Sequence, residues 1–259
     1  MTVSLDALYR RLPALVTTRL DALVAGLRAG LGDELHAVLV FGSAARGGFV
    51  ADDSDVDVIV VLNSDPRARL EAIGAALDIA RASARIECML LRADELQASA
   101  DVFPLLYDDV RGCHVMLHGH DPFAGLVIHD HHRRLRIEQE LREMRMRLRR
   151  VITDHVDDPL VLVAALLKKR KQLRSPLLAL LTLQQAKSAT DSIEDVLRAA
   201  GAHFAVDVSA LVNIPDVTNV AAVAAIDALR LVLDAAMVAV EADQATAAAA
   251  GSAASGAKP

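Results

Sequence analysis

The sequence predicts an α/β domain at the N-terminus followed by an all-α helical bundle domain. Up to about residue 125, short valine-rich apolar runs alternate with segments of helical periodicity. From about residue 132 the strand-like runs vanish. A chain of 259 residues, 53% of them apolar, can bury one large core or two modest ones. We therefore expect an α/β domain over residues 1–125, a helical domain over 126–243, and a disordered tail of alanine, glycine and serine over 244–259.

The α/β domain is expected to alternate strands and helices. Leucine and valine at helical spacing, and amphipathic segments further on, predict helices over residues 4–30 (one or two), over 66–82 and through about 109. The segment 45–54 is rich in glycine, aspartate and alanine and is expected to be a loop, either alone or with a short helix. Apolar runs predict strands at 35–41, 56–62, 85–91 and 113–119.

A single apolar stripe marks the long helix that opens the second domain. Its members recur at spacings of four, three, four and three, at Ile137, Leu141, Met144, Leu148 and Val151. Further helices are expected at 159–187, 189–200 and 218–242. Helices with one apolar face each bury it by packing as a bundle, so this region is expected to be a bundle packed on the α/β domain.

Charge is distributed unevenly along the chain. The net charge of −6 argues against a general nucleic-acid-binding protein. Residues 126–175 carry thirteen Lys and Arg against seven Asp and Glu, a net charge of +6, which leaves −12 for the rest. This basic helical stretch suits a phosphate-bearing ligand. It suits equally well a solvated helix with ion pairs such as Glu138–Arg142.

The sequence shows no sign of membrane insertion or export. Its apolar runs are too short to span a bilayer, and Asp6 interrupts the N-terminal segment, so we expect neither a membrane span nor a signal peptide. Cys88 and Cys113 fall in strand-like runs and are expected to be reduced core residues. The expected location is the cytoplasm.

One group of residues in the α/β domain suggests chemistry. A strand ends at Gly42-Ser43, and the next strand opens with Asp55-Val56-Asp57. Strand alternation places the two aspartates on the same face. Adjacent carboxylates repel each other unless a cation lies between them, and hard oxygen ligands favour Mg²⁺ or Mn²⁺ over zinc. The glycine lets the backbone approach a ligand, and the turn can hold phosphate oxygens, so the group predicts nucleotidyl transfer.

Two other interpretations of these residues are weaker. A glycine-serine pair is a common turn, and aspartates often bracket loops. The spacing of Asp53, Asp55 and Asp57 also matches the start of an EF-hand loop. That loop needs glycine at the position where Val58 begins a buried strand.

Over roughly residues 35–95 the chain resembles the polymerase-β-like nucleotidyltransferase superfamily, with its glycine-serine and aspartate-x-aspartate signature. That family has a third carboxylate on a later strand, and Glu87 is the candidate here, while Asp94 and Glu95 resemble first-turn helix acids. Most members carry aspartate at the third position; glutamate is similar to the aminoglycoside adenylyltransferases, in which it acts as the base. Arg46 resembles a recurring basic position of minimal nucleotidyltransferases. The resemblance implies a small mixed sheet with helices.

The resemblance also implies a reaction. A Mg²⁺- or Mn²⁺-dependent enzyme would move a nucleoside monophosphate onto an acceptor hydroxyl. The donor would be ATP, which supplies AMP, or another nucleoside triphosphate, which supplies its own monophosphate. The implied catalytic and metal-binding residues are Asp55, Asp57 and Glu87, and the implied nucleotide-binding residues are Gly42, Ser43 and Arg46. An appended helical domain commonly closes over the triphosphate in this family. Lys168 and Lys171, with their neighbours Lys169 and Arg170, are then candidates for phosphate contact, the alternative being a solvated charge run.

The acceptor is left open by the sequence. A small molecule such as an aminoglycoside is the first hypothesis, although the lack of tryptophan argues against stacking platforms. The second is a toxin–antitoxin or regulatory enzyme that modifies a protein or tRNA, although the acidic remainder of the chain disfavours nucleic acid as a partner. The third is a catalytically silent binding module. The sequence does not indicate the oligomeric state.

Two further patterns are weak. Arg150–His155 and Arg198–His203 fit an arginine-x4-histidine spacing similar to that of the HEPN ribonucleases, a match that arises easily by accident in an arginine-rich chain. Zinc binding by the histidines near residue 125 is disfavoured because they lack cysteine partners and a fixed helical spacing. These histidines are His118, His120, His129, His131 and His132.

Overall fold

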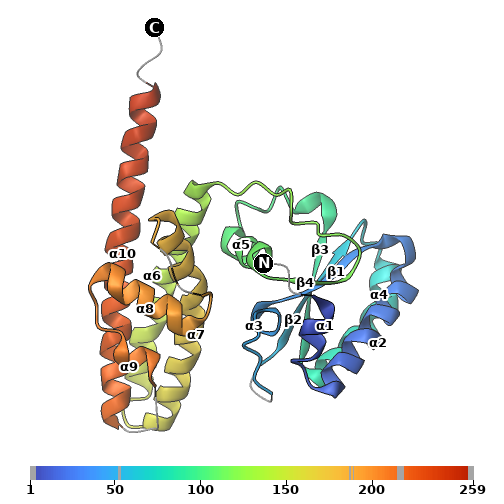
Figure 1. The fold of residues 1–259 in the computed structure, drawn as a ribbon, viewed down its shortest axis with the longest axis horizontal. Coiled ribbons are helices and arrows are strands. Elements are labelled where there is room, and N and C mark those ends of the chain that lie inside the picture. The colour runs from blue at the N-terminus through green and yellow to red at the C-terminus, as the bar shows by residue number, and fades with distance from the viewer. Residues whose placement is uncertain (1–3, 52–53, 187, 189, 215–218, 256–259) are drawn as a thin grey trace. The chain divides into compact units, whose positions relative to one another are not determined.

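A computed structural model of the chain describes residues 4–51, 54–186, 188, 190–214 and 219–255 (Figure 1). Asp53, which entered the EF-hand interpretation, lies outside the described residues. The chain divides into two compact units, Met1–Val127 and Ile128–Pro259. Each unit contains its own set of fully buried apolar side chains.

The first unit is built on a four-stranded sheet in the order β3-β2-β1-β4. The strands are β1 (Leu35–Phe41), β2 (Val56–Leu62), β3 (Ile86–Arg92) and β4 (Val115–His118). β1 is antiparallel to β2 and to β4, whereas β2 and β3 are parallel. A parallel pair needs a crossover connection, which α4 (Arg67–Ala84) supplies. The mixed sheet is therefore confirmed, with strand ends within two residues of those predicted.

The helices of this unit begin where the sequence contains helix-start signals. Pro13 precedes α2 and Pro66 precedes α4, because the fixed φ of proline suits the entry to a helix. The first two residues of the loop expected over 45–54 belong to the short helix α3. Besides α4, the helical elements are α1 (Leu5–Tyr9), α2 (Ala14–Leu31), η1 (Gly32–Glu34), α3 (Gly42–Arg46), η2 (Ala93–Glu95) and α5 (Pro104–Gly112).

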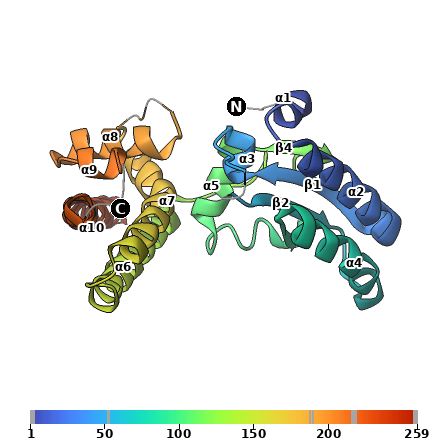
Figure 2. The same cartoon turned by 90° about the horizontal axis from the view of Figure 1, so that it is seen from below.

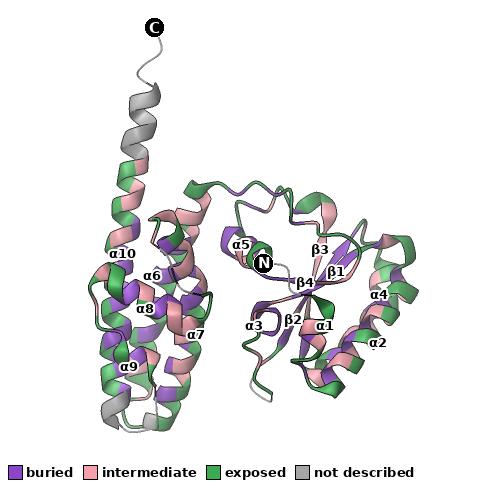
Figure 3. Ribbon diagram, in the orientation of Figure 1, coloured by how far each residue is buried: buried purple, intermediate pink, exposed green. Residues whose placement is uncertain are grey.

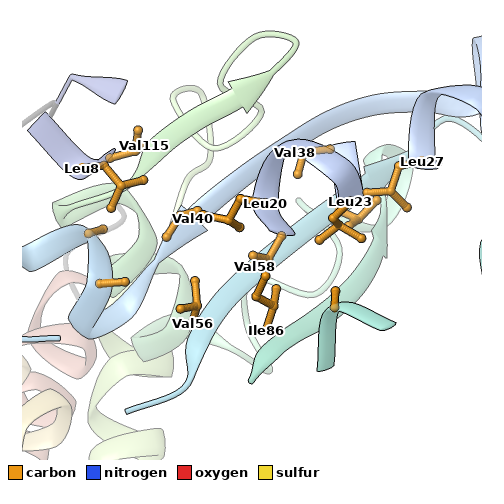
Figure 4. Close-up of a cluster of buried hydrophobic side chains, with 14 of the residues drawn as sticks. Leu8, Leu20, Leu23, Leu27, Val38, Val40, Val56, Val58, Ile86 and Val115 are labelled. Atoms are coloured by element: carbon orange, nitrogen blue, oxygen red, sulfur yellow. The ribbon is translucent and has the colours of Figure 1, made fainter. Parts of the chain in front are cut away.

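An apolar core fills the space between the sheet and the helices α2 and α4, which lie side by side (Figures 1, 2 and 4). Strand alternation directs Val56 and Val58 into this core and places Asp57 on the opposite face of β2. α2 contributes leucines at helical spacing, among them Leu20, Leu23 and Leu27. The packing of β2 on one face thus fixes which face carries its carboxylate.

Every element that the structure describes in the second unit is a helix. These are α6 (Asp130–Asp154), α7 (Pro159–Leu183), α8 (Ile193–Phe204), α9 (Ser209–Val212) and α10 (Asn219–Ser255). α6 packs against α7 and α10, and Figure 3 shows the buried residues on the three helices. The apolar stripe predicted on α6 is buried from Ile137 to Leu148, and Val151 is half-buried. The predicted fold class, an α/β part followed by a helical part, is confirmed.

The C-terminal helix departs from the expectation for the tail. Low complexity predicts disorder from residue 244, whereas α10 continues to Ser255. Alanine has the highest helix propensity, so an alanine-rich segment extends a helix that packing has already nucleated. Residues 256–259 lie outside the described part of the chain. The short α9 was not predicted.

Two simpler expectations concern membranes and cysteines. Within the described residues, no helix is both long and apolar enough to cross a membrane. Cys88 is half-buried on β3, Cys113 is buried after α5, and both are free thiols. Burial and, to a smaller extent, the nearby charge of Glu87 raise the pKa of the Cys88 thiol to about 12, so this thiol is protonated at neutral pH.

Candidate active site

The turn after β1 brings its glycine against a carboxylate of the next strand. Phe41, the last residue of β1, pairs in register with Asp57 of β2. Gly42 follows with a φ of +70°, in the left-handed region that favours glycine. A Cβ at this position would lie 2.2 Å from Oδ2 of Asp57, so the carboxylate would have to move to admit any other residue. Gly42 is therefore required both by its backbone conformation and by the carboxylate that lies against it.

Asp57 and Glu87 are neighbours across the parallel β2–β3 pair. The register places them directly opposite each other, so their side chains leave the same face of the sheet. Asp57 is half-buried and Glu87 is exposed. The pKa of Asp57 is raised to about 6, mainly by burial and also by the charges of Asp55 and Glu87, against the opposing charge of the Arg46 guanidinium. The sheet thus gathers three carboxylates whose charges repel one another.

Asp55 precedes β2 and forms an ion pair that sequence reasoning did not anticipate. Nε of Arg85 donates to Oδ1 of Asp55 at 2.8 Å, and both side chains are about half exposed. Arg85 ends α4 with a φ of +51°. Its carbonyl accepts the N–H of Val56 at 2.9 Å, which holds the arginine beside the aspartate. No sequence pattern could have identified Arg85, because its partner lies thirty residues earlier in the chain.

The donor set suits a divalent cation but is not assembled around one position. Among the described residues, no three His, Cys, Asp or Glu side chains are arranged to hold a metal ion. The oxygens of Asp55, Asp57 and Glu87 are the hard ligands that Mg²⁺ and Mn²⁺ prefer, and their mutual repulsion is what such a cation offsets. Asp55 is occupied by Arg85 in this conformation. The guanidinium of Arg85 therefore competes with a metal ion for the carboxylate of Asp55.

The short helix α3 carries the other two candidates of this face. Ser43 is half-buried, and within the described chain its hydroxyl has no hydrogen-bond partner, so it is available to a ligand. Its carbonyl accepts the N–H of Gly48 at 2.9 Å, which closes the turn. Arg46 is the last residue of α3 and lies close enough to Asp57 to lower its pKa. The structure thus brings Gly42, Ser43, Arg46, Asp55, Asp57 and Glu87 to one end of the β1–β2–β3 sheet.

The basic residues predicted for phosphate contact belong to α7 in the second unit. Lys168 and Lys171 are exposed there. Lys169 is buried and its ammonium donates to Oε1 of Gln172 at 3.0 Å, and Arg170 forms an ion pair with Glu194. Of the four basic residues in this run, the two exposed ones are thus Lys168 and Lys171, which were predicted to contact the nucleotide. Their role stays a prediction.

In the remaining sequence patterns, the histidines and arginines contact residues that are close to them in the chain. The rings of His131 and His132 lie 3.7 Å apart at the start of α6. In the two arginine-x4-histidine matches, Arg150 pairs with Asp154 and Arg198 pairs with Asp195, both through exposed guanidinium groups. These arginines are therefore engaged in ordinary helix ion pairs.

Residues 31–158 match the family model of the nucleotidyltransferase domain. This part of the chain, which contains all six residues gathered at the end of the sheet, therefore belongs to the nucleotidyltransferase domain family, and the protein is a transferase of that class. The chain is also similar to a solved structure, the spectinomycin adenyltransferase AAD(9) from Enterococcus faecialis with ATP and spectinomycin. The likeness has 15% sequence identity, covers 84% of this chain and 99% of that chain, and has a TM-score of 0.47. No curated protein matches the chain significantly.

Proposed function

We propose that the protein transfers a nucleoside monophosphate, AMP from ATP, onto a hydroxyl of a small-molecule acceptor, in a reaction that depends on Mg²⁺ or Mn²⁺. The observation that carries this proposal is the contact of Asp57 with Gly42 on one side and its register pairing with Glu87 on the other. A phosphate-binding turn and a carboxylate cluster then share one end of the sheet. That combination suits in-line displacement at a phosphorus atom.

Each residue of this chain has a role in the proposed reaction. Asp55 and Asp57 would hold the divalent ion, which when bound supplies positive charge to the carboxylates and to the triphosphate. Gly42 and Ser43 would orient the β and γ phosphates. Glu87 is exposed and lies opposite Asp57, and it would accept the proton of the acceptor hydroxyl. The hydroxyl oxygen would then bond to the α-phosphorus as the bond to pyrophosphate breaks.

The charge of the chain favours a cationic small acceptor. Outside residues 126–175 the chain carries a net charge of −12, which attracts a polyamine-like or aminoglycoside-like polyol and repels RNA. The alternative is a toxin–antitoxin or regulatory enzyme that modifies a protein or tRNA. The basic stretch on α6 and α7 is the feature that favours this alternative, because it could face a macromolecular anion.

The test is transfer of label from α-³²P-ATP in the presence of Mg²⁺. Purified protein is incubated with aminoglycosides, with tRNA or with cell lysate, and the products are separated by size and charge. Label on a small polyol supports the proposal, whereas label on protein or tRNA supports the alternative. Asp57→Asn is expected to reduce transfer by about 100-fold or more. Asp78→Asn, at an exposed position on α4, is the matched control and is expected to keep full activity.

If no acceptor is labelled, and the Asp57→Asn variant binds ATP with Mg²⁺ as tightly as the parent protein does, the assignment of the active site is wrong. Binding can be followed by equilibrium dialysis with labelled ATP. This second measurement separates a wrong acceptor panel from a wrong site.

A further inference from the structure

A pocket of about 300 Å³ lies in the second unit between α6 and α10. Its floor is apolar and is formed by Leu148 and Leu233, which are buried, together with Ile152. Its rim carries three guanidinium groups and one carboxylate, from Arg145, Arg149, Arg230 and Asp234. The α6 residues follow one another at helical spacing, so one face of that helix forms one wall. A volume of this size accommodates a small organic molecule.

Next to the pocket, a series of ion pairs joins the two helices, and we call this series the ladder. Arg134 pairs with Asp243, Arg142 pairs with Glu241, and Arg145 pairs with Asp234, so residue numbers rise along α6 as they fall along α10. The two helices are therefore antiparallel, and these three arginines of α6 each meet an acid of α10. The pocket lies at the last of these pairs, Arg145–Asp234.

One helical turn beyond the Arg145–Asp234 pair, the next position of the ladder carries an arginine on both helices, and both arginines line the pocket. Arg149 follows Arg145 by four residues, and Arg230 precedes Asp234 by four. Arg149 has no acidic partner among the described residues. Arg230 has a single distant one, Asp227, at 3.9 Å on its own helix. Among the described residues, no carboxylate lies between Arg149 and Arg230 as one does in the three pairs above, and the pocket lining carries three arginines against one aspartate.

We propose that this pocket binds a small organic anion, whose carboxylate or phosphate lies between Arg149 and Arg230. The apolar body of the ligand covers Leu148, Ile152 and Leu233. Arginine suits this role because its planar fork binds carboxylates and phosphates with two hydrogen bonds. The pocket is formed by residues of the second unit alone, whereas the carboxylates of β2 and β3 belong to the first, and the proposal does not depend on nucleotidyl transfer.

The experiment uses the whole protein and a fluorescent probe of the same chemistry, 1-anilinonaphthalene-8-sulfonate. Displacement of the probe is measured with 2-naphthyl phosphate, 2-naphthoate and the neutral 2-naphthol, which share one body and differ in the head group. We expect the two anions to compete more strongly than the naphthol, and the stronger of the two identifies the preferred head group. Equal competition by all three would overturn the proposal, because the arginines would then contribute nothing.

Variants locate the binding. Arg149→Gln is expected to weaken binding of the anions by about three- to tenfold and to leave 2-naphthol unchanged. Arg150→Gln is the matched control, since Arg150 is the next residue, is exposed, pairs with Asp154 and does not line the pocket. Ile152→Trp fills the pocket and should abolish binding of anion and naphthol alike. If Arg149→Gln binds the anions as the parent protein does, while its helical circular dichroism is unchanged, the site is wrong.

Discussion

Replacing Asp57 by asparagine removes a charge that the fold itself opposes. Asp57 is half-buried against Gly42, and its ionised form is disfavoured first by burial and then by the charge of Asp55, with a smaller contribution from Glu87. Asparagine has nearly the same shape and carries no charge. In the absence of metal, we therefore expect Asp57→Asn to be more stable than the parent protein at neutral and alkaline pH.

The size and the sign of this gain follow from the pKa. In the unfolded chain the carboxyl has an ordinary pKa of 3.8, and in the fold the pKa is about 6. The folded state therefore holds the proton more tightly, so the parent protein loses stability as the pH rises between about 4 and 6. A shift of about two units corresponds to about 3 kcal/mol, and partial exposure of the carboxylate reduces it to about 2 kcal/mol. Asparagine escapes this loss, so its advantage is full above pH 7 and absent near pH 3.

Urea unfolding followed by tyrosine fluorescence measures this gain for the unit of the chain that contains Asp57. The chain has no tryptophan and two tyrosines, Tyr9 and Tyr107, and both belong to the unit that contains Asp57. The signal therefore reports unfolding of that unit, whether or not the helical unit unfolds with it. Asp78→Asn, on the exposed side of α4, is the control and should change stability by less than about 0.5 kcal/mol at any pH.

Two results would contradict this reasoning. If Asp57→Asn is less stable than the parent protein at pH 8, the carboxylate makes favourable contacts that outweigh its burial. If its advantage is the same at pH 3 and pH 8, the effect does not come from the charge.

Two further variants test the neighbours of this carboxylate. Gly42→Ala places a methyl group 2.2 Å from Oδ2 of Asp57 at a positive φ. It should lose at least about 2 kcal/mol of stability in the same tyrosine assay, and unchanged stability would show that the turn adapts freely. Arg85→Gln releases the carboxylate of Asp55. The affinity of this variant for Mn²⁺, measured by electron paramagnetic resonance, should therefore be about two- to fivefold higher than that of the parent protein. Arg81→Gln, one turn earlier on α4, removes an ion pair that does not involve the site and should leave Mn²⁺ binding unchanged.

Local patterns in the sequence were sufficient to predict the elements that position the candidate site. β1 and β2 are runs of apolar, mostly branched residues, and such runs are recognisable because each strand must be buried on at least one face. The bounds of α3 were not predicted, because five residues that begin with glycine give no periodicity. The extension of α10 to Ser255 was not predicted for a different reason, since an alanine-rich composition is compatible with both disorder and helix.

Features that depend on pairing between distant segments could not be predicted. Arg85 meets Asp55 only because α4 crosses over and returns β3 parallel to β2. Likewise, Arg149 and Arg230 line the same pocket only because α6 and α10 pack antiparallel. Each of these arginines lies in an ordinary helical segment of the sequence, with nothing local to distinguish it from an arginine that is simply solvated.

The two faces of β2 explain why the chemistry was nevertheless easier to recognise than its surroundings. On one face, Val56 and Val58 satisfy every preference of a buried strand. On the other, Asp57 is an ionisable group in a half-buried place, next to a second carboxylate and against a glycine with a positive φ. A stable fold gains nothing from such an arrangement, so a sequence that keeps it beside a well-packed core indicates function rather than structure. The stability gained by Asp57→Asn would therefore measure how much the fold gives up to keep three carboxylates ready for a cation.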